Sequence, residues 1–109
     1  MKFLVWVKPS ATNQPPMDQF PAILRGFQDT IRKQLSDHTL DCAYAYGQGE
    51  GFGIIDCASL EEAWDRTMEN PLALFWDIDI RALADPIAVT GMQIRSLDAL
   101  NSAMPSGVR

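Results

Sequence analysis

The spacing of apolar residues changes along this chain, and the order of those changes constrains the fold more than any other feature. In residues 2–8 apolar side chains fall on both faces of an extended segment, which is typical of a strand covered on both sides. In residues 18–36 they recur every three or four positions, the period of an amphipathic helix. The chain is therefore predicted to begin with a strand and a helix.

The predicted first helix starts near Asp18 or Phe20, with a proline in its first turn, and ends within residues 36–39. Gly26 weakens such a helix by about 1 kcal/mol relative to Ala, so we expect this glycine to allow close packing. The apolar stripe of the helix consists of Phe20, Ile23 or Leu24, Phe27, Ile31 and Leu35.

A glycine-rich segment separates two further predicted strands, residues 40–46 and 52–57. Residues 47–51 have the length and composition of a hairpin turn whose glycines supply positive φ. A dinucleotide-binding loop would need a third glycine where this chain has Phe52 or Ile54, and the Gly-Lys-Ser or Gly-Lys-Thr of a phosphate-binding loop does not occur. The segment therefore predicts a plain hairpin.

The remaining elements follow from cap and stop signals. Ser59 and Glu62 form the capping box of a second helix, and Asn70-Pro71 ends it. Residues 72–83 are predicted to form the last strand. One face of that strand carries Asp77, Asp79 and Arg81, and the other carries Trp76, Ile78 and Ile80.

The predicted order is β-α-β-β-α-β, which indicates a ferredoxin-like α+β fold: a four-stranded antiparallel sheet with both helices on one face. Residues 1–85 form this domain, and residues 86–109 form a C-terminal extension with a short helix at 96–104. The uncovered sheet face bears Leu4 and Trp6, and we expect it to be too apolar to remain exposed to solvent. We therefore expect at least a dimer, paired face to face, with the extension packed on a partner subunit.

The charge and hydropathy of the chain argue against two classes of partner, nucleic acids and membranes. A net charge of −5, with nine scattered basic residues, argues against nucleic acid. The N-terminal segment has five consecutive apolar residues, too few for a signal peptide or a membrane span, so we expect a cytoplasmic protein with no membrane contact. Cys42 and Cys57 are interpreted as two buried thiols.

Four segments of the second half follow one pattern: a strand ending in aspartate, a Ser-capped helix, a Pro-Leu turn, and a strand of alternating aromatic, acidic and hydrophobic residues. They are Ile54-Ile55-Asp56, Ser59-Leu60-Glu61-Glu62, Asn70-Pro71-Leu72 and Phe75-Trp76-Asp77-Ile78-Asp79-Ile80. This pattern resembles the muconolactone delta-isomerase-like proteins, whose hairpin glycine corresponds to Gly47. The resemblance implies a dimeric α+β barrel, in a superfamily that includes isomerases, cyclases, dehydratases and cofactor-independent monooxygenases.

Candidate proton-transfer groups are few. His38 is the only histidine, in the loop after the first helix, and Asp18 lies near the start of that helix as a base or a cap. Tyr44 and Tyr46 point the same way along the second strand. If they face the helices they can stabilise an oxyanion in a pocket, and if they face a partner sheet they are dimer contacts.

No metal or cofactor site is predicted. With one histidine and two isolated cysteines the chain has no zinc or haem pattern. Asp77 and Asp79 lack a third ligand at supporting spacing, so we interpret them as a charge ladder with Arg81.

Three hypotheses for function follow. The first is a small cofactor-independent enzyme of the isomerase, cyclase or dehydratase type, acting by proton transfer on a small cyclic, aromatic or polyketide-like molecule. The second is a cofactor-independent monooxygenase of the same fold. The third is a non-catalytic binding or interaction protein, which is favoured by Gln48 where the family has a histidine after its hairpin glycine.

Overall fold

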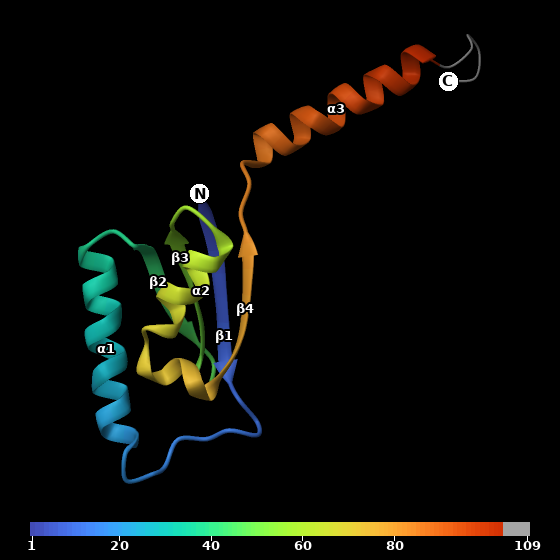
Figure 1. Ribbon diagram of the computed structural model, residues 1–109. Helices are drawn as coiled ribbons and strands as arrows, with labels where there is room; N and C mark the ends of the chain where they lie inside the picture. The colour runs from blue at the N-terminus through green and yellow to red at the C-terminus, as the bar shows by residue number, and fades with distance from the viewer. Residues whose placement is uncertain (104–109) are drawn as a thin grey trace.

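The sheet and its two covering helices form one body, and a third helix projects from its end (Figure 1). A computed structural model describes residues 1–103. The four strands are antiparallel in the order β2-β3-β1-β4. This is the predicted ferredoxin-like topology, so the fold prediction is confirmed. The strands are β1 (Lys2–Pro9), β2 (Leu40–Tyr46), β3 (Glu50–Asp56) and β4 (Trp76–Ala82).

The core lies between the helices and one face of the sheet. Val5, Leu40 and Ile55 form its buried centre, and Ile31 of α1 (Phe20–Ser36) packs against them. The strand register is consistent with this, since Ile55 lies opposite both Phe3 and Leu40. The alternate residues of the strands face away from the helices, as a two-residue period requires.

Helix α1 has the predicted extent but not the predicted stripe. Gln34 is buried, with 5% of its surface exposed, whereas Leu35 is 39% exposed. After Ile31, the buried side of α1 therefore continues with the Gln34 amide and not with Leu35. Gly26 is a point of close approach, because a Cβ atom there would lie 2.8 Å from Cγ of Pro71. This agrees with the close packing expected at Gly26.

The glycine-rich segment is a hairpin turn, as predicted. Gly47 and Gly49 have φ angles of 59° and 80°, in the region that favours glycine. Gly51 serves a different purpose, since a Cβ atom there would lie 2.8 Å from the backbone oxygen of Tyr44. A β-bulge lies between Leu40 and Cys42 in the pairing of β2 with β3.

Helix α2 (Leu60–Met68) is capped by Ser59, whose Oγ accepts a hydrogen bond from the Glu62 backbone nitrogen at 3.2 Å. The Glu62 side chain accepts in turn from the backbone nitrogen of Ala58 rather than that of Ser59. The predicted strand start at residue 72 is wrong. The chain first forms the 3-10 helix η1 (Pro71–Phe75), because the Asn70 side chain caps it and its first residue is proline.

Helix α3 (Pro86–Ala103) is longer than the predicted segment 96–104, and Met104 lies outside the described residues. Asp85 accepts a hydrogen bond from the Ile87 backbone nitrogen at 2.9 Å and so caps the start of the helix. None of its residues is buried. Within residues 1–103, no helix has the length and hydropathy needed to cross a lipid bilayer.

The sheet face opposite the helices is uncovered; we call it the open face. In this single chain the sheet is open, with β2 and β4 as its edges, and does not close into a barrel. Trp6 lies opposite Phe52 in the register, and Leu4 lies opposite Ile54. The apolar side chains of this face are Leu4, Trp6, Tyr44, Tyr46, Phe52 and Ile54.

Candidate ligand-binding cavity

A cavity of about 380 Å³ lies between α1 and the covered face of the sheet; we call it the helix–sheet cavity. Leu24, Phe27 and Ile31 of α1 line one side. Leu24 is 39% exposed, so the cavity reaches solvent at this side. A volume of this size falls in the range of small-molecule sites, roughly 300–1,000 Å³.

The cavity exists because the strands beneath α1 carry small residues on their covered face. Register places Ala43 opposite Gly53 and Ala45 opposite Gly51. All four line the cavity. Because none of them projects a large side chain, the space between this half of the sheet and α1 stays unfilled.

Aromatic rings stand at one side of the cavity. Phe27 and Trp76 both line it and pack edge to face, with ring centroids 5.9 Å apart and planes at 88°. This arrangement is favoured by the quadrupoles of the rings. The cavity therefore offers apolar walls to a ring-shaped ligand.

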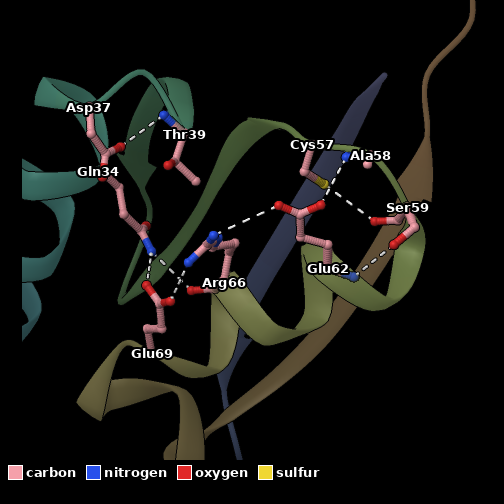
Figure 2. Close-up of polar contacts among 9 residues, drawn as sticks. All are labelled: Gln34, Asp37, Thr39, Cys57, Ala58, Ser59, Glu62, Arg66 and Glu69. Atoms are coloured by element: carbon pink, nitrogen blue, oxygen red, sulfur yellow. Dashed lines mark hydrogen bonds and ion pairs between the residues drawn. The ribbon is translucent and has the colours of Figure 1, made fainter.

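Three polar side chains reach the lining from the helical layer: Gln34 of α1, Thr67 of α2 and Asn70. All three are buried. Gln34 Nε2 donates to the Arg66 backbone oxygen at 2.9 Å and to Glu69 Oε2 at 3.3 Å (Figure 2). Thr67 Oγ1 donates to the Ala63 backbone oxygen at 2.8 Å.

Two ion pairs of Arg66 lie next to the Gln34 amide. Arg66 Nη1 lies 2.8 Å from Glu69 Oε1, and its Nη2 lies 3.8 Å from Glu62 Oε1 (Figure 2). The hydrogen bond to Glu69 raises the pKa of Arg66 above its usual value. Glu69 is therefore fixed between the guanidinium group and the Gln34 amide.

Ionisable groups are scarce around the cavity. Within residues 1–103, Glu50 is the one carboxylate-bearing residue of the lining and Tyr44 the one phenol. Glu50 is partly buried, but it lies opposite Tyr46 in the register, so its side chain projects to the open face, with Oε2 beside Gly47 at the hairpin turn. No Lys, Arg or His residue is part of the described lining.

The two tyrosines lie on the open face. The bulge after Leu40 places Cys42, Tyr44 and Tyr46 on the face opposite to Leu40. Trp6 Nε1 donates a hydrogen bond to the Tyr46 hydroxyl. The Tyr44 ring packs on Phe52 at a centroid distance of 5.7 Å. The structure thus places both tyrosines on the face away from the helices, and their contact with a partner sheet stays a prediction.

The other two predicted site residues are exposed and lie apart from the cavity lining. His38 follows α1 with a φ angle of 63°. Asp18 precedes α1, whose N-cap is Gln19 without a side-chain hydrogen bond. The structure therefore does not bring His38, Asp18 and the tyrosines together. Sequence reasoning missed Gln34 and Asn70 as cavity residues; the position of Gln34 three residues after Ile31 was the available signal.

The remaining sequence interpretations concern the charge ladder on β4, the two cysteines and metal binding. Arg81 Nε donates to Asp79 Oδ2 at 3.0 Å, as the predicted charge ladder requires. Cys42 and Cys57 are free and partly buried. Within residues 1–103, no group of three or more His, Cys, Asp and Glu side chains is arranged to hold a metal ion.

Comparison with protein-family models and with curated protein sequences gives no match. Solved structures do match. Muconolactone isomerase, solved at 3.3 Å resolution, aligns with a TM-score of 0.64 and 19% identity over 79% of this chain and 92% of that chain. The dehydrochlorinase TftG from Burkholderia phenoliruptrix AC1100, which acts on 5-chloro-2-hydroxyhydroquinone, aligns with a TM-score of 0.55 and 11% identity over 81% of this chain and 98% of that one. That structure is a complex with 2,5-dihydroxybenzoquinone. The chain therefore shares the fold of these enzymes.

Proposed function

We propose that this protein is an enzyme that moves a proton on a small, uncharged cyclic molecule bound in the helix–sheet cavity, and so isomerises, cyclises or dehydrates it. One observation carries the proposal: a cavity of about 380 Å³ with apolar walls, aromatic rings and a few buried polar groups. Such a composition is typical of small-molecule sites. The two structural neighbours support the choice of ligand, since the names of both refer to small cyclic compounds.

The chemistry we propose is the transfer of a proton between two carbons of the bound ring. A base removes a proton from a carbon next to a ring carbonyl, and the electrons of that C–H bond move into an enolate. The proton then returns to a different carbon, so the product is an isomer and no oxidation occurs. Glu50 is not assigned the role of base, because its position opposite Tyr46 directs its side chain to the open face.

We further propose a homodimer formed through the open face. Trp6 and Phe52 lie at neighbouring positions there, and Tyr44 is 64% exposed. A second copy of the same face would cover these apolar side chains. In the same assembly we place α3 on the partner, because an 18-residue helix with only Arg95 and Asp98 charged has no buried residue in the single chain.

The proposal is tested by following deuterium uptake from solvent into lactones and cyclic ketones by NMR. We expect the native protein to accelerate exchange at carbons next to the carbonyl. Ala43→Leu fills the floor of the cavity and should reduce this acceleration about 10²-fold, as misplacement of a substrate does. Ala22→Leu, at an exposed position of α1, should leave it unchanged.

Two outcomes would contradict the proposal. One is the absence of acceleration for every lactone and ketone tried. The other is an equal rate in Ala43→Leu, which would place the reaction outside the cavity.

A second candidate function is binding without chemistry. It is favoured by the small number of ionisable groups at the cavity and by the exposure of His38 and Asp18. Cyclic molecules would then bind, and Ala43→Leu would weaken binding, while solvent deuterium would not enter the ligand. The same NMR experiment therefore separates the two candidates.

A further inference from the structure

We infer that the side-chain amides of Gln34 and Asn70 form a hydrogen-bond acceptor and donor pair that selects a ring bearing one hydroxyl and one carbonyl group. This inference rests on the proposed function, because it names the ligand class of the same cavity. Gln34 and Asn70 are 5% and 4% exposed, so both amides are removed from bulk solvent. Buried polar groups of this kind are costly unless they find a partner.

The orientation of the Gln34 amide is fixed by its partners. Its Nε2 donates to the Arg66 backbone oxygen and to the Glu69 carboxylate. Both partners are acceptors only, so the amide has to present its NH₂ group to them. The Oε1 atom is left over, and no hydrogen-bond partner for it is found within residues 1–103. It is an acceptor for a ligand hydroxyl.

The Asn70 amide is oriented by the backbone. Its Oδ1 accepts a hydrogen bond from the Leu72 backbone nitrogen at 2.9 Å, as the cap of η1. An N–H group can only donate, so the cap requires the oxygen at this position. Nδ2 is left over, without a partner in the described part of the chain. It is a donor for a ligand carbonyl.

Both leftover atoms face accessible space. Within residues 1–103, no fully buried side-chain nitrogen or oxygen lacks a hydrogen-bond partner. Gln34 Oε1 and Asn70 Nδ2 are therefore not sealed in the protein interior. Both residues line the helix–sheet cavity, and almost none of their surface is exposed elsewhere. We therefore assign the space that these two atoms face to the helix–sheet cavity.

The two amides are held to one short segment. Gln34 is bound to Arg66 and Glu69, and the Asn70 backbone nitrogen donates to the Thr67 oxygen at 3.2 Å. The acceptor and the donor are thus anchored to residues 66–70 and keep a fixed relation to each other. Fixed polar groups in an otherwise apolar site set the orientation of a ligand.

The charge of the cavity limits the ligand further. No cationic residue belongs to the described lining, whereas the Glu69 carboxylate lies behind Gln34. A carboxylate or phosphate ligand would lack a counter-charge there. The amides therefore select an uncharged hydroxy-carbonyl compound. In the proposed reaction, Asn70 Nδ2 would also stabilise the enolate oxygen.

The test compares four kinds of probe on the native protein by NMR titration of the Trp76 indole and the side-chain amides. The probes are the three isomers of hydroxycyclohexanone, then cyclohexanone, cyclohexanol and cyclohexene. We expect at least one hydroxycyclohexanone to bind about tenfold more tightly than cyclohexanone and cyclohexanol, as one added hydrogen bond allows.

Two variants assign the atoms. Gln34→Met should remove the tenfold preference for the hydroxyl without changing cyclohexanone binding. Asn70→Asp keeps the cap on Leu72 but replaces the donor by an acceptor, so it should weaken cyclohexanone about tenfold and leave cyclohexanol unchanged. Gln28→Met on the exposed side of α1 and Asn101→Asp on α3 are the matched controls.

Each possible result of the titrations either supports or contradicts the inference. If cyclohexene and all other probes bind with equal affinity, the amide inference fails while the cavity remains a ligand site. If no probe binds, the inference and the proposed function both fail. Because the probe series needs only the native protein, an unstable Gln34→Met leaves the test intact.

Discussion

The two faces of the sheet are built from the same strands yet have opposite characters. On the covered face β2 and β3 present Ala43, Gly51 and Gly53, and the space above them is the helix–sheet cavity. On the open face the neighbouring positions of the same strands are Tyr44 and Phe52. One alternation of small and aromatic residues thus leaves a cavity on one side and an exposed apolar surface on the other.

The two faces differ in the chemistry of their side chains as well as in side-chain size. The covered face meets buried amides from the helical layer, whereas the open face has a tryptophan–tyrosine hydrogen bond and, on β4, the Asp79–Arg81 ion pair. Substitutions on each face are therefore expected to change different measured quantities.

The largest difference is expected in turnover. Ala43→Leu on the covered face should reduce the rate of proton exchange about 10²-fold, as misplacement of a substrate does. Tyr46→Phe and His38→Ala should leave the rate unchanged, because neither residue borders the cavity. An inactive Tyr46→Phe together with a fully active Ala43→Leu would break the comparison and move the chemistry to the open face.

Only substitutions on the open face should change the affinity of dimerisation. Trp6→Asp would bury an unpaired charge between two sheets and should weaken dimerisation by at least about thirtyfold, as loss of an interface hot spot does. Gln28→Asp places the same charge on an exposed position of α1 and should have no effect. Sedimentation equilibrium measures both. A native protein that stays monomeric at micromolar concentration would contradict the dimer.

Stability should respond to added bulk between the strands. Gly51→Ala brings a Cβ atom within 2.8 Å of the Tyr44 backbone oxygen and should lower the free energy of unfolding by roughly 1–3 kcal/mol. Gly91→Ala meets its nearest neighbour at 3.6 Å inside α3 and should raise helix stability by up to about 1 kcal/mol. Urea denaturation gives both values, and equal signs would be inconsistent with the close approach at Gly51.

The smallest effect is expected at Asp37, which belongs to neither face. Its hydrogen bonds with Thr39 lower the pKa of its carboxyl group. A lowered pKa means that the ionised carboxylate stabilises the fold above its unfolded-state pKa of about 4, and that this contribution is lost as the pH falls below that value. Asp37→Asn should flatten the acid side of the thermal-stability profile slightly. An identical profile in both proteins would argue against this role.

Sequence reasoning predicted the elements and their order because periodicity, caps and breakers are local signals. It did not predict which face the tyrosines take. Simple alternation keeps Tyr44 and Tyr46 on the face of Leu40, but the bulge after Leu40 moves them to the other side. A bulge is set by strand pairing, which is a non-local property.

The cavity was also hidden from sequence reasoning for a physical reason. Gly51 and Gly53 have hairpin-like composition, so their second role, leaving space under α1, shows only once the register is known. Gln34 competes with Leu35 for the same helix face, and the buried position of the amide depends on the carbonyl of Arg66 in another element. Interactions between distant segments decided both points.

The projection of α3 has a consequence for scattering experiments. The described chain has a radius of gyration of 20.1 Å and a longest dimension of 72 Å. A compact chain of this length would have a radius of gyration of about 13 Å. The helix leaves the domain only three residues after β4 ends at Ala82. Small-angle X-ray scattering therefore reports directly on where α3 lies in solution: its pair-distance distribution has a long tail when the helix stands free and loses that tail when a second subunit receives it.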